Sequence, residues 1–302
     1  MQVEIKDVSG IDELERWIAV HNAVRADDPA NLEQKVLIRA EELEHVDFLA
    51  YVDGEPVGVA KLSGDSESVR SGCPWIDVCV LPARRRRGIG SALLEAVSAQ
   101  ARRQGKVALA GEARADDVES VGFLERRGFV ESGRFERLEL DLDSGGEADV
   151  AVPPGLKLAW LADRPTLLTG MYEVAAATYP ELGGYIGRQA ETLVQWQVYE
   201  LGSGAALLDL TPLALADGRV VGFATIKGLD ELAAELRMVC VLPEWRGRGI
   251  ARALLEAQLA AARRAGLRRA VTWVRDSEPR GLYQRLGMHP GAAAIEFRGP
   301  LV

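Results

Sequence analysis

The sequence predicts an α/β protein made of two copies of one mixed fold. Its 302 residues exceed the length of one ordinary domain and fit two domains of roughly 150 residues each. The segment "VLPARRRRGIGSALLEA" at 80–96 returns as "VLPEWRGRGIARALLEA" at 241–257, an offset of 161 residues. In both halves, strand-like apolar runs alternate with segments of helical periodicity. These three observations predict two mixed α/β units.

Further segments repeat in the same order. "VDGEPVGVA" at 52–60 resembles "ADGRVVGFA" at 216–224, and each places an Asp-Gly turn between two apolar runs, which is a hairpin signal. Downstream, "FLERRGF" at 123–129 corresponds to "LYQRLGM" at 282–288. The shared order covers most of each half, so the duplication concerns whole domains.

The junction between the copies is predicted in "DSGGEADVAVPPG", residues 143–155. Its Gly, Ser, acidic and Pro content is typical of an exposed linker. We therefore predict an N-terminal domain over 1–142 and a C-terminal domain over 156–302.

Each half is expected to form a strand, two helices, a three-strand meander, a long helix, a strand, a shorter helix and terminal strands. The long helix of the second half is predicted at about 250–265, with apolar residues at helical spacing at Leu254, Leu255, Leu259 and Ala262. It ends in "RRAG", basic residues followed by a C-capping Gly. The following "RRAVTWV" is rich in β-branched and aromatic residues, which favours a strand.

Composition excludes several classes of protein. Hydrophobic residues make up 48% of the chain and charged residues 27%, and no run approaches the ~18 consecutive apolar residues of a membrane helix. The N-terminus "MQVEIKDVSG" lacks the pattern of a secretion signal, so we expect a cytoplasmic protein without membrane contact. Residues 1–150 carry a net charge of −11 and residues 151–302 of +2. This acidic balance argues against nucleic acid as a partner.

Cysteine and histidine are sparse. The three cysteines are Cys73, Cys79 and Cys240, two of them inside the repeated "VCVLP", and no CxxC or HExxH spacing occurs. The three histidines lie far apart in the sequence, at 21, 45 and 289. We expect neither disulfides nor a metal site.

The repeated loop has the features of an anion site. Pro243 cannot donate to a sheet ladder and ends the strand. Gly247 and Gly249 allow a tight turn and a close approach of backbone to a ligand. The free N–H groups of the next helix and the charges of Arg246 and Arg248 would suit a phosphate or pyrophosphate. A glycine-rich turn before a helix is also common without any ligand.

The whole frame of strand, loop and helix closely resembles the coenzyme-A loop of the GNAT superfamily of N-acetyltransferases. That family's pattern is Q/R-x-x-G-x-G/A. It is met by Arg246, Gly249 and Ala251 in the second half and by Arg85, Gly88 and Gly90 in the first. The resemblance extends over nearly the full length of both halves.

The resemblance implies two tandem GNAT-type domains, each a mixed, mostly antiparallel sheet with helices on both faces and a splayed strand pair. It also implies acetyl-CoA as cofactor, with its pyrophosphate on the backbone amides of 247–252 and its pantetheine arm paired with the backbone of Val239 and Val241. The residues expected to bind it are Val239, Cys240, Val241, Arg246, Gly247, Arg248, Gly249, Ile250, Ala251, Arg252 and Asp276. A second site in the first half would comprise Val78, Val80, Arg85, Arg86, Arg87, Gly88, Ile89, Gly90 and Ser91.

Acetyl transfer to an amine needs two proton movements. A base must take a proton from the ammonium group, and an acid assists the leaving thiolate. In many family members the base is a Glu eleven residues before the Arg or Gln of the loop, and the acid is a Tyr in the helix before "GF". Glu235 and Tyr283 fill these places in the second half. Glu235 could instead be a solvated strand-end carboxylate beside a catalytic water chain, and Tyr283 a packed helix aromatic.

The first half lacks both groups. Eleven residues before Arg85 stands Pro74, and Leu124 takes the place of the Tyr. We therefore hypothesise that the N-terminal domain is catalytically inactive and the C-terminal domain active. Asp276 replaces an Asn that is common in the family, which leaves its role open.

The acceptor is expected to be a primary amine of a small molecule or peptide. Candidate lining residues are Tyr179, Glu181, Tyr185 and Trp196, although such aromatic residues more often pack in a core. Two alternatives remain: an acetyltransferase of the mycothiol-synthase type, which acetylates a cysteinyl amine, and a CoA-binding regulator without turnover. The arginine-rich, lysine-poor composition suits a GC-rich bacterium. The duplication is compatible with a monomer, and a homodimer is the other alternative.

Overall fold

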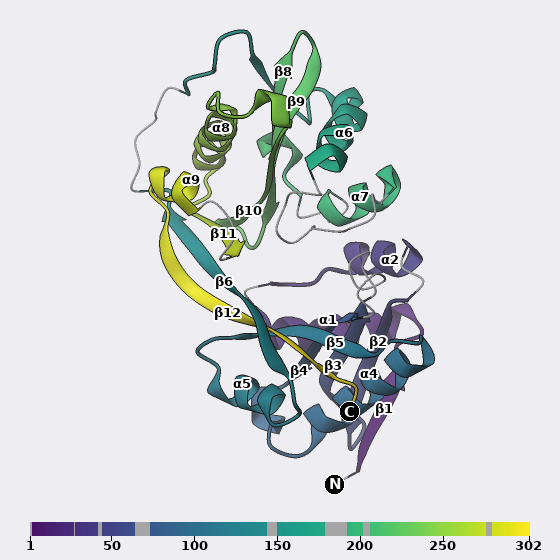
Figure 1. The fold of residues 1–302 in the computed structure, drawn as a ribbon. Helices are drawn as coiled ribbons and strands as arrows, with labels where there is room; N and C mark the ends of the chain where they lie inside the picture. The colour runs from purple at the N-terminus through teal and green to yellow at the C-terminus, as the bar shows by residue number, and fades with distance from the viewer. Residues whose placement is uncertain are drawn as a thin grey trace. The chain divides into compact units, whose positions relative to one another are not determined.

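The computed structural model describes residues 2–26, 28–41, 44–63, 73–143, 150–178, 192–201, 206–275 and 280–302. Its packing divides the chain into two compact units, drawn in Figure 1. The N-terminal unit contains Met1–Arg134 and Ala294–Val302. The C-terminal unit contains Phe135–Ala293.

The N-terminal unit is a mixed sheet with the strand order β1-β2-β3-β4-β5-β12. All of its recorded pairings are antiparallel except that of β4 with β5. In chain order its elements are β1 (Val3–Asp7), α1 (Ile11–Val24), α2 (Leu32–Glu41), β2 (Val46–Val52), β3 (Glu55–Ser63), β4 (Trp75–Val80), the 3-10 turn η1 (Pro82–Arg84), α4 (Ile89–Arg103), β5 (Ala108–Arg114), α5 (Val118–Glu125) and the start of β6 (Val130–Asp141).

The C-terminal unit repeats this plan with the order β6-β11-β10-β9-β8-β7, and β10 and β11 are its parallel pair. Its elements are β7 (Lys157–Trp160), η2 (Pro165–Leu167), α6 (Leu168–Thr178), α7 (Leu193–Glu200), η4 (Leu208–Leu210), β8 (Pro212–Ala216), β9 (Arg219–Gly228), β10 (Ala233–Val241), η5 (Pro243–Trp245), α8 (Ile250–Arg264), β11 (Arg269–Arg275), α9 (Arg280–Arg285) and β12 (His289–Pro300). The predicted pair of mixed, mostly antiparallel folds is confirmed. Among the described helices, none is long and apolar enough to span a membrane.

Each sheet carries helices and an apolar core on both faces. In the N-terminal unit, α4 packs on one face over a cluster that includes Leu93 and Leu94, while α1 places Trp17 and Leu14 on the other. In the C-terminal unit, α8 and α6 take the corresponding places. This arrangement fixes the start of α4 and of α8 against the sheet.

The two halves of the sequence exchange their last strands. Residues 135–141 of β6 pair with β11, in the register Arg269↔Asp141 to Arg275↔Phe135. Residues 294–300 of β12 pair with β5, from Ala294↔Arg114 to Pro300↔Ala108. The sequence repeat and the packing units therefore divide the chain at different places. Of the predicted linker, residues 144–149 lie outside the described residues.

One glycine in each sheet brings the long helix close to the backbone. A Cβ on Gly58 of β3 would lie 3.1 Å from both the carbonyl oxygen of Cys79 and the side chain of Ile89. A Cβ on Gly222 of β9 would lie 2.9 Å from the carbonyl oxygen of Cys240. Only glycine leaves room for this approach, which seats the first turn of each long helix directly on the sheet.

Candidate functional site

The two repeated loops have the same backbone geometry. A 3-10 turn follows the strand, and the chain then enters the long helix through a left-handed N-cap glycine, Gly88 or Gly249, each with φ of 82°. The preceding turns also have positive φ, 61° at Arg86 and 74° at Gly247. Neither N-cap position makes a side-chain cap hydrogen bond. The first-turn N–H groups of both helices are therefore available to an anion.

The first arginine of each motif ties the loop to its strand. Arg85 Nε donates to the carbonyl oxygen of Val80 at 3.2 Å, and Arg246 Nε donates to that of Val241 at 3.1 Å. Sequence reasoning assigned Arg246 only a charge beside the anion. The structure adds a positioning role, because this bond holds the turn in the shape that exposes the helix amides.

The parallel strands separate in front of each loop. In the N-terminal unit the recorded pairing of β4 with β5 is confined to Trp75↔Ala110. In the C-terminal unit the pairing of β10 with β11 ends at Glu235↔Val271. The strand segments nearer the loops are thus open toward their parallel neighbour, which suits an extended ligand that adds its own hydrogen bonds to the strand.

A β-bulge distinguishes the two central strands. On β10 the register with β9 shifts between Leu236, opposite Ile226, and Val239, opposite Ala224. On β4 the register with β3 is regular from Trp75 to Val80. Bulges re-aim side chains and interrupt pairing, and they are over-represented next to active sites.

The bulge also changes which residues correspond. Glu235 lies opposite Val271, and in the other unit Trp75 lies opposite Ala110, so Trp75 occupies the place of Glu235. Counting along the sequence placed Pro74 there. That count is wrong by one residue, because it ignored the extra residue in β10. Neither Pro74 nor Trp75 can act as a base, so the comparison of the halves is unchanged.

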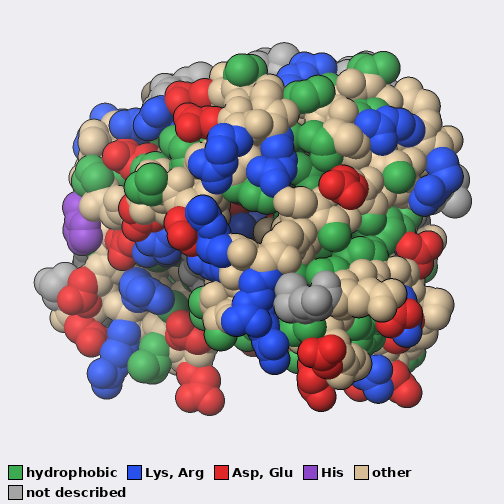
Figure 2. All heavy atoms as spheres, turned by 90° about the horizontal axis from the view of Figure 1, so that it is seen from below, with side chains coloured by type: hydrophobic (Ala, Val, Ile, Leu, Met, Phe, Trp, Pro, Cys, Tyr) green, Lys and Arg blue, Asp and Glu red, His purple; other side chains and the backbone are tan. Residues whose placement is uncertain are grey.

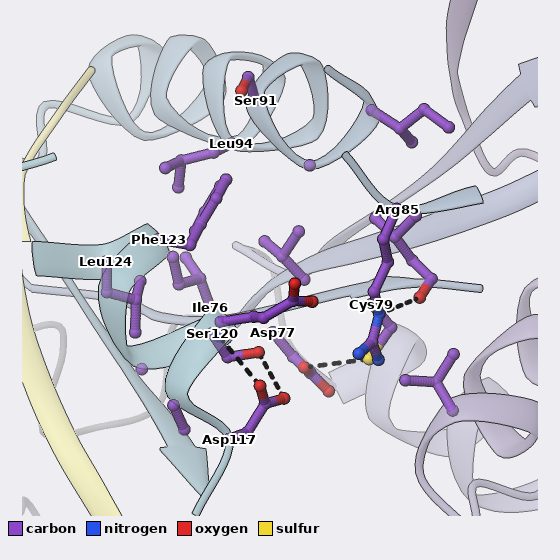
Figure 3. A pocket seen from close by; sticks show the side chains of 18 of the residues that line it. Ile76, Asp77, Cys79, Arg85, Ser91, Leu94, Asp117, Ser120, Phe123 and Leu124 are labelled. Carbon is purple, nitrogen blue, oxygen red and sulfur yellow. Dashed lines mark hydrogen bonds between the residues drawn. The ribbon is translucent and has the colours of Figure 1, made fainter. Parts of the chain in front are cut away.

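A cavity of about 500 Å³ lies in the N-terminal unit, between the open strands and the loop (Figure 3). Of the nine residues predicted for a second CoA site, all but Arg87 line it. The sequence analysis missed several others that line it, including Arg25, Asp77, Glu112, Ser120 and Phe123. Ser120 lies in the first turn of α5 and donates to the side chain of the N-cap residue Asp117 through both its backbone N–H and its hydroxyl.

Arginine is the main charged residue of the cavity wall. Besides Arg25, the lining includes Arg84, Arg85, Arg86, Arg114, Arg126 and Arg127. Basic side chains also gather around a hollow on the face seen in Figure 2. A wall of this kind, beside uncapped helix amides, suits a ligand with several phosphate charges.

The predicted catalytic pair lies in the C-terminal unit. Glu235 is 13% exposed, and its Oε1 lies 3.5 Å from Nη1 of Arg237. Tyr283 is 9% exposed and packs on α9 within the core cluster beneath α8. Leu124, its sequence counterpart on α5, is partly buried.

The structure does not place several other predicted residues at the site. Four of them lie outside the described residues: Asp276, Tyr179, Glu181 and Tyr185. Trp196 is fully buried, with its ring centroid 6.1 Å from that of Phe223, and so packs in the core as the alternative interpretation held.

Comparison with known families agrees with this geometry. The model described as "Acetyltransferase (GNAT) family" matches residues 12–129, and that described as "Acetyltransferase (GNAT) domain" matches residues 210–288. The chain is a tandem GNAT acetyltransferase.

Several known proteins are similar to this chain over nearly its whole length. The mycothiol acetyltransferase of Clavibacter michiganensis subsp. michiganensis is 29% identical over 291 residues, covering 91% of this chain and 87% of that protein. The mycothiol acetyltransferase of Thermomonospora curvata is 27% identical, covering 92% and 90%. Among solved structures, a tandem GNAT protein from the clavulanic acid biosynthesis pathway superposes with a TM-score of 0.77 at 20% identity, over 100% of this chain and 99% of that chain.

The GNAT family uses acetyl-CoA, and the residues of both loops fit it. The diphosphate would meet uncapped helix amides, and the pantetheine arm would run along the strand edge left open by the splay. The thioester supplies the acetyl group.

The cysteines of this GNAT protein are not suited to nucleophilic chemistry. Cys73, Cys79 and Cys240 are free and buried. Burial raises the pKa of the Cys240 thiol to about 12, and burial together with the neighbouring Asp77 raises that of Cys79.

His21, Asp77 and Cys79 place ligand-type atoms within 4.8 Å of one another. The protonated thiol and the guanidinium of Arg25, 4.0 Å from Asp77, make this cluster unsuitable for a metal cation.

A row of charged residues crosses the N-terminal sheet on the face covered by α1. The register places Asp47 of β2 opposite Lys61 of β3, and Lys61 opposite Asp77 of β4. Glu112 follows on β5, two residues after the pair Trp75↔Ala110. Asp47 is fully buried and pairs with Lys35 of α2 at 2.5 Å. The acidic residue inside the strand "WIDVCV" was the sequence signal for this row.

The pKa of Asp47 gives the N-terminal unit a specific acid sensitivity. Burial alone would raise this pKa, but the hydrogen bond from His45 and the charge of Lys35 outweigh it and hold it well below its usual value. A carboxyl with a depressed pKa contributes stability that is present above its unfolded pKa, near 4, and is lost as pH falls toward the folded pKa.

We therefore expect Asp47→Asn to lower the free energy of unfolding by about 1–3 kcal/mol at pH 7 and to flatten its decrease below pH 4. Denaturant unfolding of both proteins between pH 7 and pH 2 measures this. Parallel curves at all pH values would show that Asp47 is not a source of the acid sensitivity.

Proposed function

We propose that the C-terminal half transfers the acetyl group of acetyl-CoA to a primary amine of a small molecule or peptide by direct attack. The β-bulge between Leu236 and Val239, which has no counterpart on β4, is the observation that carries this proposal. It interrupts the ladder of β10 with β9 beside the edge of β10 that is open toward β11, where the thioester would lie. The regular register of β4 accords with an inactive N-terminal half.

Two residues divide the proton chemistry. Glu235 accepts the proton of the acceptor's ammonium group, directly or through water, while the amine nitrogen bonds to the acetyl carbonyl carbon. Tyr283 supplies a proton to the sulfur as the carbon–sulfur bond breaks, so that CoA leaves as the thiol. Arg237 lies beside this carboxylate, with its Nη1 3.5 Å from Oε1 of Glu235.

The similar proteins favour one chemical class of acceptor. Proteins named mycothiol acetyltransferase match this chain over more than 90% of its length, at 26–29% identity. This similarity favours a mycothiol-type acceptor, in which the attacking group is a cysteinyl amine. At this level of identity other primary amines remain candidates.

The acceptor class is tested by incubating the protein with acetyl-CoA and single amines while free thiol release is followed. The amines comprise a cysteinyl amide, amino sugars, polyamines and short peptides. We expect release with at least one primary amine and none with its N-methylated tertiary analogue. Binding of acetyl-CoA without thiol release across all classes would favour the regulator alternative.

For the N-terminal half, we propose that the cavity binds CoA without turnover. The support is its lining, which combines the uncapped amides after Gly88 with the arginine-rich wall. The counterparts of the catalytic pair, Trp75 and Leu124, offer no titratable group.

Matched glycine substitutions separate the two sites. A valine at Gly88 or Gly249 must adopt φ near 82°, which costs about 1–2 kcal/mol for a side chain with a Cβ and is worse for a branched one. We expect Gly249→Val to lower kcat/KM for acetyl-CoA by about tenfold or more, and Gly88→Val to leave it within about twofold while removing one of two bound CoA molecules in equilibrium dialysis. An equal loss of turnover in both variants would contradict the assignment of separate roles.

A further inference from the structure

The N-terminal cleft carries a charged bridge where its two strands part. The pairing of β4 with β5 is recorded at Trp75↔Ala110, and two residues further on stand Asp77 and Glu112. Arg25, the C-cap residue of α1, reaches both. Its Nη2 lies 3.0 Å from Oε1 of Glu112, and its Nη1 lies 4.0 Å from Oδ1 of Asp77. The guanidinium thus joins two strands that the backbone ladder no longer holds together.

The bridge faces the cavity. All three side chains line the cavity, and they are only 16–30% exposed. Burial raises the pKa of Glu112, although the charge of Arg25 and its hydrogen bond oppose that rise. Burial opposes the charge of Arg25, but the two carboxylates outweigh it and raise its pKa. Burial also opposes the charge of Asp77, but the hydrogen bond from His21 and the charges of Lys61 and Arg25 hold its pKa well below the usual range.

The bridge stands at the end of the cleft away from the phosphate loop. Asp77 precedes Pro82, the first residue of the loop's turn, by five residues, which corresponds to roughly 17 Å along an extended strand. A ligand with its phosphates on the amides after Gly88 and its chain along β4 would therefore bring its far end to Arg25.

The described residues of the C-terminal unit carry a different charged group at this place: Arg237 of β10 lies 3.5 Å from Glu235 and 4.0 Å from Glu200. Lys61 and Glu112 have the uncharged counterparts Thr225 and Trp273, while the place of Asp77 is shared by the two bulge residues Arg237 and Met238, of which Met238 is buried. The backbone N–H of Met238 donates to Thr225 Oγ1 at 3.1 Å, so this N–H group of the bulge has a hydrogen-bond acceptor. Among the described residues, a guanidinium that joins the two parallel strands of a unit is thus found in the N-terminal copy.

We propose that Arg25 is an ionic brace that closes the inner end of the N-terminal cleft, so that a CoA thioester held there is shielded from amines. This rests on the proposed binding of CoA in that cleft. To reach the thioester from the α1 side of the sheet, an ammonium group would have to displace Arg25 from two partly buried carboxylates. Removing one partner of such a pair leaves a buried charge uncompensated, which is strongly unfavourable.

The proposal is tested with hydroxylamine as a small nucleophile. Its nitrogen bonds to the acetyl carbonyl carbon, the carbon–sulfur bond breaks, and the products are acetohydroxamic acid and the CoA thiol, which receives the proton lost by nitrogen. All measurements use the Gly249→Val background, at an acetyl-CoA concentration too low to fill the weakened C-terminal site, so that acetyl-CoA occupies only the N-terminal cleft. Equilibrium dialysis first establishes one bound acetyl-CoA per chain.

In this background we expect bound acetyl-CoA to be cleaved at least tenfold more slowly than free acetyl-CoA. Adding Arg25→Ala is expected to raise the rate at least tenfold. Arg25→Ala leaves two buried carboxylates without their positively charged partner. A second variant therefore combines Arg25→Met, Asp77→Asn and Glu112→Gln, which removes the brace and leaves no unpaired buried charge. The matched control is Arg16→Ala, because Arg16 is an exposed arginine of the same helix α1 and does not belong to the cavity lining; it should leave the protection unchanged.

The possible outcomes distinguish a failure of the brace proposal from a failure of the proposed CoA binding in the N-terminal cleft. Absence of bound acetyl-CoA in the Gly249→Val background would overturn the CoA assignment and the brace with it. Bound acetyl-CoA that reacts as fast as free acetyl-CoA would overturn the brace alone. So would persistent protection in the uncharged triple variant, provided that dialysis still shows one bound molecule.

Discussion

Replacing Tyr283 by Phe is expected to lower kcat about 10²–10⁴-fold, the range typical of the loss of a general acid or base. Phe keeps the ring that packs in the core beneath α8, where Tyr283 is only 9% exposed, and removes only the hydroxyl. Without that proton donor, the CoA sulfur must leave as a thiolate. Steady-state assays of free thiol release, with the acceptor saturating, measure the change.

The matched substitution in the other copy is Leu124→Ala, which should leave kcat within about twofold. Thermal unfolding of both variants shows whether a lost activity reflects lost folding. A normal kcat for Tyr283→Phe would make Tyr283 a packed helix aromatic, which was the alternative interpretation of its position. The opposite pattern, with activity lost in Leu124→Ala alone, would assign catalysis to the N-terminal half.

The parts of the site that the sequence predicted well are those determined by local chemistry. Pro82 and Pro243 end their strands, and Gly88 and Gly249 take up φ of 82° to begin their helices. Each of these effects depends on one or two residues and their immediate neighbours, so the loop could be recognised twice from the printed sequence.

The parts that were missed depend on pairing between distant strands. The bulge in β10 follows from its register with β9, and it moved the counterpart of Glu235 from Pro74 to Trp75. Residue counting assumes that both copies pair without insertions, and here one copy does not. The brace formed by Arg25 was missed for the same reason. Its two carboxylates lie 52 and 87 residues away in the sequence, and they meet Arg25 only when α1 covers the open strands.

The exchange of the last strands was also beyond a sequence argument. Residues 130–141 and 289–300 both have the composition of strands, and nothing in their alternation specifies which of two similar sheets each one joins. The structure pairs residues 294–300 with β5, in the copy that begins the chain. Stability of the N-terminal unit therefore depends on residues from the far end of the sequence.

Phe297 provides the sharpest test of that dependence. It lies on β12 opposite Gly111 of β5, is 2% exposed, and belongs to the same core cluster as Leu109 and Phe129 of the N-terminal unit. Truncating a buried Phe costs about 3–5 kcal/mol through lost transfer free energy and the cavity left behind. We expect Phe297→Ala to destabilise the protein by that amount.

The location of the damage distinguishes this prediction from ordinary core disruption. Amide hydrogen exchange should rise first in β5, at 108–114, while β11, at 269–275, keeps its protection. Arg298→Ala is the matched control, because Arg298 alternates to the opposite face of the same strand and is exposed; it should change stability by less than about 1 kcal/mol. If exchange in Phe297→Ala rose first in β11, the last strand would belong to the sheet of its own sequence half, and the strand exchange would be wrong.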